Sequence, residues 1–272
     1  MKTALSIAGS DPSGGAGIQA DLKTMTMHGV YAMSAVTALT AQNTTGVRGV
    51  LECSPEFLAL QLDCVFSDIV PDAVKTGMVA SAPLIRVIAD RLTHYQVQNL
   101  VVDPVMGDHG KPYRTYTPEL CGRMRDLAAQ ADVITPNLTE GALLLEEDYA
   151  DLPRDEEGLR AWLERLSLDG RRSVVLTGVS LRPGAIGAGC FDRATGRIRF
   201  AMARQEPAQF PGTGDLFASV VLGAMLRGEP LETAAQRAAE FVQRCAAHTL
   251  ALGTPVLEGV QFEPLLGELM QR

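Results

Sequence analysis

Short apolar runs alternate along this chain with longer segments in which apolar residues recur at helical spacing. Ile18, Leu22 and Met25, for example, fall three or four positions apart, which places them on one face of a helix. Two further helices are expected to begin at Ser54 and Thr117, because each hydroxyl residue precedes a proline that fits the first helical turn. The apolar runs predict strands over 3–9, 31–42, 73–77, 99–105, 132–137, 173–178, 185–192 and 196–203.

This alternation predicts the fold class. Strands that alternate with helices form βαβ units, in which a mainly parallel sheet carries helices on both faces. The last two strands flank the turn RATG at 193–196, and we expect them to form an antiparallel hairpin at one edge of the sheet. Because no long linker, low-complexity tract or internal repeat interrupts the pattern, we expect one domain over residues 1–272.

Composition and charge exclude several classes of protein. The chain is 46% hydrophobic and 21% charged, which allows a large core and argues against disorder. A formal net charge of -8 without a basic cluster argues against a nucleic-acid partner. No stretch reaches the roughly 18 apolar residues of a membrane helix, and the apolar N-terminal run is too short for a signal peptide. We therefore expect a soluble, cytoplasmic protein.

The cysteines show no metal-binding pattern. The chain has five of them, no two form a Cys-x-x-Cys pair, and none stands at metal-ligand spacing from a histidine. We expect thiols that are buried as small apolar side chains, and no structural zinc site.

Polar and glycine-rich residues follow nearly every expected strand. Ligands of parallel α/β sheets bind beyond the carboxyl ends of the strands, so this pattern predicts a site at that edge. The glycine-rich loop after the first strand lacks both the G-x-G-x-x-G spacing and the G-K-[ST] of a P-loop, so a tight turn and a ligand loop both stay open. The strand-end residues are Gly9–Gly17, Gln42 and Asn43, Thr76–Met78, Asp103–Gly110, Asn137–Glu140, and Thr177 and Gly178.

Two carboxylates in this set have two interpretations each. Asp103 ends a strand directly before Pro104, where it either has a structural role or binds Mg²⁺ through water, as phosphate-handling sites commonly do. Glu140 lies early in a helix, where the helix macrodipole alone favours a negative charge. The position of Glu140 by itself therefore does not establish a ligand.

The segment 211–217, PGTGDLF, carries the strongest indication of chemistry. Consecutive N–H groups in a Gly212-Thr213-Gly214 turn that opens a helix form an anion-binding site. Asp215 would repel a phosphate there unless it takes a proton from the attacking alcohol, and phosphoryl transfer requires such a residue together with positioned donors and Mg²⁺. The alternative is a helix cap, which Ser or Thr would supply without two glycines. We expect Asp215 to be a catalytic base.

The chain also resembles a known family. The segments SIAGSDPSGGAGIQADLKTM, VVDPVMGD, VITPNLTE and PGTGDLFAS together resemble the ribokinase-like vitamin kinases, and the resemblance covers essentially the whole chain. Those ATP-dependent enzymes phosphorylate the hydroxymethyl group of hydroxymethylpyrimidine, in the thiamin pathway, or of pyridoxal, pyridoxine and pyridoxamine, in vitamin B6 salvage. The resemblance implies a ribokinase-like three-layer α/β/α sandwich with a central mainly parallel sheet, ATP and Mg²⁺ as cofactors, and a homodimer.

The resemblance differs between the two halves of the chain. Up to about residue 100 the sequence is similar to hydroxymethylpyrimidine kinases, whereas from VVDPVMGDHGKPYRTYTPEL onward it is similar to pyridoxal and pyridoxamine kinases. Pyrimidine kinases typically have a cysteine where Asp215 stands, and a KGG stretch where Thr177, Gly178 and Val179 stand. The physiological substrate therefore stays open, and we expect phosphorylation of both compounds.

Matched residue by residue, the resemblance assigns roles to the strand-end side chains. Asp215 matches the catalytic base, and Gly212, Thr213 and Gly214 match the anion hole. A carboxamide suits the edge of an aminopyrimidine, and methionine suits a heteroaromatic ring. The other matches are Asp103 and Glu140 as acids that hold the metal through water, Asn137, Thr177 and Gly178 at the ATP phosphates, and Gly9, Asp21, Gln42, Met78 and Val105 in the substrate pocket.

Plainer interpretations and other functions stay open as well. Met78 fits a core position, Gln42 an exposed loop amide, and Asp21 a polar residue on the first turns of a helix. A ribokinase-like sugar kinase would need several carboxylates and amides in the N-terminal loops, which hold mostly Gly, Ser and Met. A binding or regulatory protein of the same fold is the second alternative, although the intact GTGD argues against it.

Overall fold

The computed structural model describes residues 1–270. The strands of its main sheet are β1 (Thr3–Ser10), β2 (Tyr31–Asn43), β3 (Gly46–Glu52), β4 (Ala73–Thr76), β5 (Leu100–Val102), β8 (Val133–Ile134), β9 (Ser173–Val179), β10 (Ala185–Asp192) and β11 (Arg197–Arg204). A separate two-stranded ribbon pairs β6 (Gly107–Asp108) with β7 (Lys111–Pro112). The helices are α1 (Gly17–Met27), α2 (Pro55–Asp68), α3 (Ala82–His94), α4 (Pro118–Ala129), α5 (Leu138–Leu145), α6 (Glu156–Leu166), α7 (Thr213–Leu226) and α8 (Leu231–Leu252), with 3-10 helices at Tyr149–Asp151, Val256–Glu258 and Glu263–Met270.

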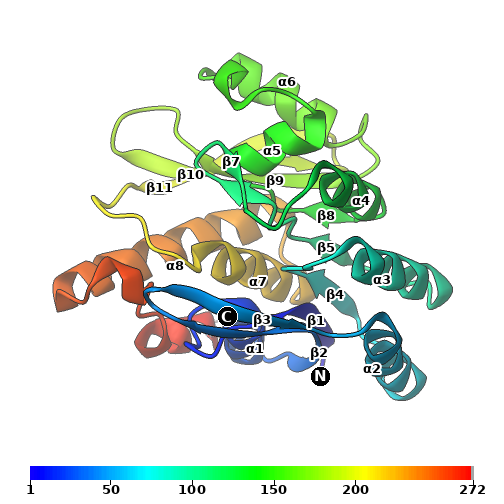
Figure 1. Ribbon diagram of the computed structural model, residues 1–272. Helices are drawn as coiled ribbons and strands as arrows, with labels where there is room; N and C mark the ends of the chain where they lie inside the picture. The colour runs from blue at the N-terminus through cyan, green and yellow to red at the C-terminus, as the bar shows by residue number, and fades with distance from the viewer. Residues whose placement is uncertain (271–272) are drawn as a thin grey trace.

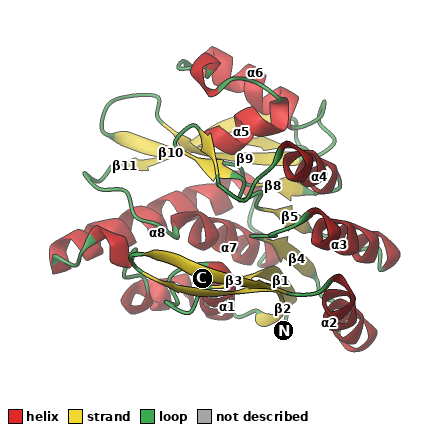
Figure 2. Ribbon diagram, viewed as in Figure 1, coloured by secondary structure: helices red, strands yellow, loops and turns green. Residues whose placement is uncertain are grey.

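The elements form the predicted α/β sandwich. The nine strands lie in the order β11-β10-β9-β8-β5-β4-β1-β2-β3, and helices cover both faces of the sheet (Figures 1 and 2). The strands from β9 to β2 in this order run parallel. β10 and β11 form the expected antiparallel hairpin at one edge.

The local signals at two helix starts are confirmed. The Ser54 hydroxyl accepts a hydrogen bond from the N–H of Phe57 at 3.2 Å, and the Thr117 hydroxyl accepts one from the N–H of Leu120 at 3.2 Å. Each bond satisfies an N–H that has no partner inside the helix, which is why these hydroxyl residues stand where the helices begin.

The structure adds a strand that the hydrophobic pattern does not predict. β3 pairs antiparallel with β2 at the second edge of the sheet. All of its residues except Gly49 are exposed, including Val47 and Leu51. A strand with no buried face lacks the alternation of apolar and polar positions from which strands are recognised. The β6–β7 ribbon is not predicted either, because each of its strands has only two residues and two residues form no recognisable pattern.

Two apolar cores lie on the two faces of the sheet. Leu5 and Ile7 of β1 pack in the core that faces α2 to α6. Ala4, which points to the opposite face, packs in the core that contains residues of α1, α7 and α8. Because side chains alternate along a strand, one strand supplies both cores, and the central strands are buried on both faces.

The topology fixes where a ligand can bind. From β1 the chain passes through α1 to β2 on one side, and it later returns to β4 on the other side of β1. In open α/β sheets the crevice for ligands lies beyond the carboxyl ends of the strands, at the point where the order of the strands in the sheet reverses. The carboxyl ends of β1, β4 and β5 therefore define the region in which a site is expected.

The structure also bears on two other expectations. Among the described residues, no helix combines the length and the apolar composition needed to cross a membrane. All five cysteines are free thiols. Cys121, Cys190 and Cys245 are buried as expected, whereas Cys64 is exposed and Cys53 is half-buried. The prediction that the thiols are buried was therefore wrong for these two residues.

One histidine is buried without a hydrogen-bond partner. His28 follows α1 and is 5% exposed, and neither of its ring nitrogens has a partner within the described structure. Its ring lies against α7, where a Cβ added at Gly223 would come within 2.4 Å of the His28 Cγ. Burial lowers the pKa of His28 to about 3, and the nearby charges of Arg227 and Arg237 lower it further in the same direction. His28 is therefore neutral in the folded protein.

This neutral histidine predicts a pH dependence of stability. The unfolded chain binds a proton below the ordinary histidine pKa of about 6.5, whereas the folded protein does not until about pH 3. The contribution of His28 to the free energy of unfolding is thus complete above pH 6.5 and decreases by ~1.4 kcal/mol per pH unit below it. His28→Leu should flatten the slope of unfolding free energy between about pH 4 and 6, measured by urea denaturation. The exposed His109 is the control, and an unchanged slope in His28→Leu would contradict the assignment.

Candidate active site

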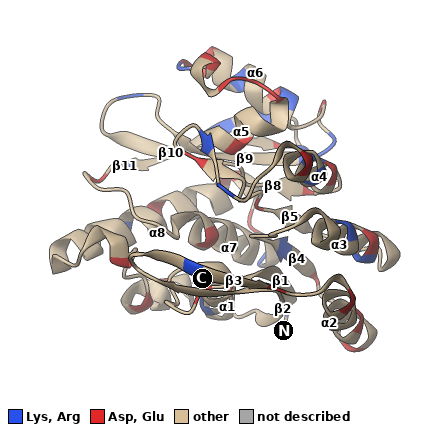
Figure 3. Ribbon diagram, in the orientation of Figure 1, with Lys and Arg blue, Asp and Glu red and all other residues tan. Residues whose placement is uncertain are grey.

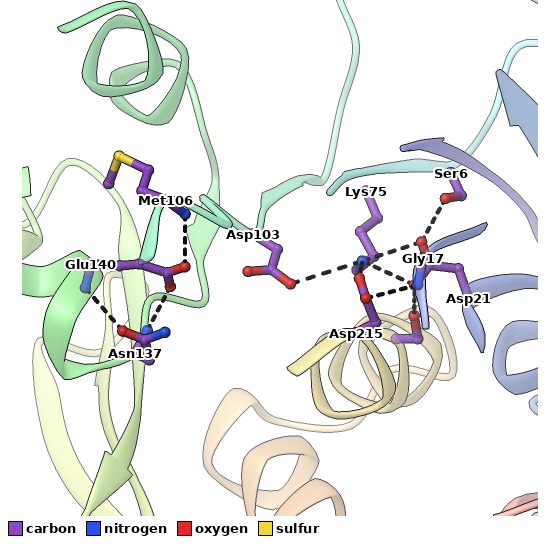
Figure 4. A network of polar contacts seen from close by, with 10 residues as sticks. Ser6, Gly17, Asp21, Lys75, Asp103, Met106, Asn137, Glu140 and Asp215 are labelled. Carbon is purple, nitrogen blue, oxygen red and sulfur yellow. Dashed lines mark hydrogen bonds and ion pairs between the residues drawn. The ribbon is translucent and has the colours of Figure 1, made fainter. Parts of the chain in front are cut away.

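A buried lysine lies at the centre of the site. Lys75 belongs to β4, where Figure 3 shows a basic residue within the sheet, and its side chain is completely buried. Its Nζ lies 2.9 Å from Asp21 Oδ1, 3.0 Å from Asp215 Oδ1 and 3.9 Å from Asp103 Oδ2 (Figure 4). Lysine is almost never fully buried unless it is paired. Lys75 was not among the residues predicted from the sequence, where the available signal was a lysine within the short expected strand AVKTG.

Asp215 faces the lysine and the glycine-rich loop, not its own helix. Its Oδ1 accepts from Lys75, and its Oδ2 accepts from the N–H of Gly17 at 2.8 Å. Both donors belong to other elements, so the carboxylate is not engaged in capping α7. The side chain is 17% exposed and remains accessible. This geometry favours the predicted base over the alternative of a cap.

In the turn before Asp215, the backbone approaches the glycine-rich loop closely. Gly212 has φ of +82°, and a Cβ there would lie 2.4 Å from the carbonyl oxygen of Gly15. The first N–H groups of α7 have no acceptor within the helix. At Gly214 the space beside the backbone is open, since no heavy atom apart from its chain neighbours and the backbone of α7 lies within 4 Å of an added Cβ. The three residues Gly212, Thr213 and Gly214 thus present an accessible helix N-terminus, the usual geometry of anion binding.

Asp11 organises the glycine-rich loop and was also missed by the sequence analysis. Its carboxylate accepts hydrogen bonds from the backbone N–H groups of Ser13, Gly15 and Ala16, at 2.8 to 3.1 Å. The predicted pocket residue Gln42 donates from Nε2 to Asp11 Oδ1 at 2.5 Å. Gln42 is therefore joined to the loop that lies against α7.

The other predicted pocket residues divide into two groups. Gly9 and Met78 lie together, because a Cβ added at Gly9 would meet Met78 Cε at 2.4 Å. Val105 has φ of +44°, a strained conformation for a β-branched residue. Asp21 differs from these, since its side chain is completely buried and bonds to Ser6, Ser219 and Lys75. The structure thus places Asp21 beneath the site rather than on its surface.

Glu140 and Asn137 form a second polar cluster at the start of α5. The two residues make a capping box, in which Asn137 Oδ1 accepts from the N–H of Glu140 and Glu140 Oε2 accepts from the N–H of Asn137. Glu140 Oε1 accepts from the N–H of Met106 at 2.9 Å. Thr177 pairs with Asn137 in an isolated bridge, and Gly178 follows with open space around it. Asp103 lies between this cluster and Lys75 (Figure 4).

Burial and repulsion shift the charges of the site. Burial raises the pKa of Asp103 to about 7, and burial likewise raises the pKa values of Asp21 and Glu140. Burial would lower the pKa of Lys75, but the attraction of three carboxylates outweighs it and raises that pKa well above its usual range. Lys75 is therefore charged, and three carboxyl groups share its single positive charge.

These residues fit a magnesium site of the phosphate-linked kind. Within residues 1–270, no group of three or more His, Cys, Asp or Glu could hold a metal ion without help. Mg²⁺ is usually held by one or two carboxylates together with substrate phosphates and water, not by an all-protein cage. Asp103 and Glu140 supply two buried carboxylates, and burial raises the pKa of each. A divalent cation beside them would favour their charged forms.

Comparison with known proteins identifies the family. Residues 11–258 match the family described as phosphomethylpyrimidine kinase. The chain belongs to this family. It is 42% identical over 212 residues to the hydroxymethylpyrimidine/phosphomethylpyrimidine kinase of Salmonella typhimurium, an alignment that covers 78% of each chain.

Two further relatives extend the comparison. The chain is 42% identical over 238 residues, 88% of its length, to a thiamine biosynthesis bifunctional protein of Geobacter sulfurreducens, and the match covers only 48% of that protein. The chain thus spans about half of this relative. The crystal structure of a pyridoxal kinase from Lactobacillus plantarum superposes with a TM-score of 0.89 at 29% identity, covering 99% of this chain and 97% of that one. Members of the family and a pyridoxal kinase therefore share this fold.

Proposed function

We propose that this protein is an ATP-dependent kinase that transfers the γ-phosphoryl group to the hydroxymethyl group of a B-vitamin heterocycle. The acceptors are hydroxymethylpyrimidine or its phosphate, and pyridoxal, pyridoxine or pyridoxamine. The observation that carries the proposal is the Asp215 carboxylate, which Lys75 and Gly17 hold beside the open N-terminus of α7. Membership of the phosphomethylpyrimidine kinase family supports the same reaction.

In the proposed mechanism Asp215 accepts the proton of the acceptor hydroxyl as that oxygen attacks the γ-phosphoryl group. The N–H groups at Gly212, Thr213 and Gly214 bind the negative charge that develops on the transferred group. Bound Mg²⁺ would neutralise phosphate charge, and Asp103 and Glu140 are proposed to hold it through water.

Nucleotide and acceptor are proposed to bind on different sides of Asp103. Asn137, Thr177 and Gly178 lie at the ends of β8 and β9, where the ATP phosphates are proposed to bind. Gly9, Gln42, Met78 and Val105 are proposed to form the acceptor pocket, and Asp21 acts from beneath it. A cytoplasmic location and a homodimer complete the proposal, and sedimentation analysis tests the assembly.

Two acceptors are proposed because the observations point to both. The relatives at 42% identity include a hydroxymethylpyrimidine/phosphomethylpyrimidine kinase, whereas a structure with a TM-score of 0.89 is a pyridoxal kinase. Release of ADP with each alcohol, with and without Mg²⁺, tests the function directly. Turnover of a sugar but of neither heterocycle would favour a sugar kinase, and no turnover of any alcohol would favour a binding protein.

Removing the proposed base should abolish most turnover. Asp215→Asn keeps an oxygen that accepts from Gly17 but loses the basic carboxylate, so kcat should fall about 10²–10⁴-fold, the usual contribution of a general base. The KM for ATP should change little. The exposed Asp126 of α4 provides the matched Asp→Asn control. Near wild-type turnover in Asp215→Asn would leave this residue without a catalytic role.

Weakening the proposed metal site should change the Mg²⁺ dependence of the rate. Asp103→Ala and Glu140→Ala each remove negative charge beside the ion, so more Mg²⁺ should be needed for half-maximal rate. Glu140→Gln is informative as a second variant, because its one amide oxygen can still accept from the N–H of Asn137 in the capping box. Glu156→Ala on the exposed face of α6 is the control. An unaltered Mg²⁺ requirement in all three site variants would show that the metal binds elsewhere.

Changing Gln42 should separate the two acceptors. Loss of a matched buried hydrogen bond costs about 1–3 kcal/mol, so Gln42→Leu should lower kcat/KM for hydroxymethylpyrimidine about ten- to a hundredfold. Pyridoxal should be affected less. Because Gln42 also bonds to Asp11, Asp11→Asn reports the effect of loosening the loop alone. The two alcohols compete in one reaction and their products are followed by mass. A silent Gln42→Leu with pyridoxal as the only substrate would place ring recognition elsewhere.

A further inference from the structure

We propose that Lys75 is a positioning residue for phosphoryl transfer, which fixes the orientation of the Asp215 carboxylate, and that Asp21 fixes Lys75 in turn. The inference rests on the proposed function, since it assigns Asp215 as the base. Lys75 does not touch the reacting atoms, because its side chain is completely buried beneath the site. It acts through the carboxylate that it holds.

The lysine is held from below by an anchored carboxylate. Asp21 Oδ2 accepts from the hydroxyl of Ser6 at 2.6 Å, and its Oδ1 accepts from the hydroxyl of Ser219 at 2.7 Å. Both oxygens also lie within 3.1 Å of Lys75 Nζ. Ser6 belongs to β1 and Ser219 to α7. The side chain of Asp21, on α1, is therefore bonded both to the sheet and to the neighbouring helix. These contacts restrain both oxygens of Asp21 and the ammonium beside them.

The base is held from above by the same ammonium. Lys75 and Gly17 each donate to a different oxygen of Asp215, and two donors together define the plane of the carboxylate. Ser219 lies one helical turn beyond Asp215 on α7, so the Asp21 network fixes the helix as well as the side chain. A positioned base requires this kind of constraint, because small errors in orientation lower the rate steeply.

The ammonium also separates carboxylates that repel one another. Asp21, Asp215 and Asp103 all lie within 3.9 Å of Lys75 Nζ. Without the positive charge, Asp215 would face Asp21 with only the N–H of Gly17 to hold it. We therefore expect its carboxylate to lose its fixed direction, while the backbone groups that bind phosphate keep theirs. The loss should appear in kcat more than in KM.

Two substitutions of Lys75 distinguish this role from space filling. Lys75→Met keeps an apolar chain of similar length without the charge, whereas Lys75→Arg keeps the charge in a larger group. For a lysine that only fills space, Met would be the better substitute. For a lysine that positions Asp215 by charge, Arg should retain at least about tenfold more kcat than Met, and Met should lose about 10²-fold or more, the lower range of a general-base contribution. KM values for ATP and the alcohol should stay within about threefold in both.

A second pair of variants leaves the lysine in place. Ser219→Ala removes a hydroxyl that bonds to Asp21, and Thr24→Val removes a buried hydroxyl on α1 that has no partner in the described structure. We expect Ser219→Ala to lower kcat about three- to tenfold through loss of positioning, and Thr24→Val to change it less than twofold. This pair tests the network even if Lys75→Met does not fold, which thermal unfolding will show.

The outcomes separate this inference from the proposed function. If the wild-type protein releases ADP with either alcohol and the Lys75 and Ser219 variants behave as expected, both proposals hold. If the wild type is active but Ser219→Ala matches Thr24→Val, or Lys75→Met turns over as fast as Lys75→Arg, the positioning role is overturned alone. If the wild type phosphorylates neither alcohol, the proposed function fails and the role of Lys75 in it fails too.

Discussion

The ion pair between Lys75 and the carboxylates around it is the constraint on which the rest of the site depends. A buried ammonium is tolerated only where groups of opposite charge pair with it. Here the partners are Asp21, Asp215 and Asp103, which come from α1, α7 and the end of β5. One charge therefore joins the central strand β4 to three other parts of the fold. It also couples the geometry of the proposed base to the packing of helices on one face of the sheet.

The site around this centre is built from backbone as much as from side chains. Asp11 gathers the N–H groups of the glycine-rich loop, and that loop touches the start of α7 where Gly212 approaches Gly15. On the other side of Asp103, the capping box of Asn137 and Glu140 fixes the start of α5. Two ordered helix starts thus border one buried carboxylate whose pKa is raised to about 7. Phosphate and a divalent cation suit such a region, because each compensates the charge that the other brings.

The fold also explains how one chain can resemble two groups of vitamin kinases. The proposed acceptor pocket is formed largely by residues at the carboxyl ends of β1, β2 and β4, whereas the base and the proposed nucleotide side come from the later part of the chain. Lys75 and Asp215, 140 positions apart, meet across this division. The residues proposed for ring recognition and for phosphoryl transfer therefore lie mostly in different parts of the sequence. The ion pair between Lys75 and Asp215 connects these two parts in the folded protein.

The sequence by itself determined what depends on neighbouring residues. The alternating strands and helices, the cap at Thr117 and the GTGD turn before α7 are local patterns, and each was predicted together with Asp215 as a candidate base. Tertiary structure alone decided which distant groups meet. Neither Lys75 nor Asp11 was assigned a role from the sequence, and Asp21 was expected in the substrate pocket, although its side chain is completely buried. A charge is admitted to the interior only by partners that folding brings to it, and no spacing along the chain records those partners.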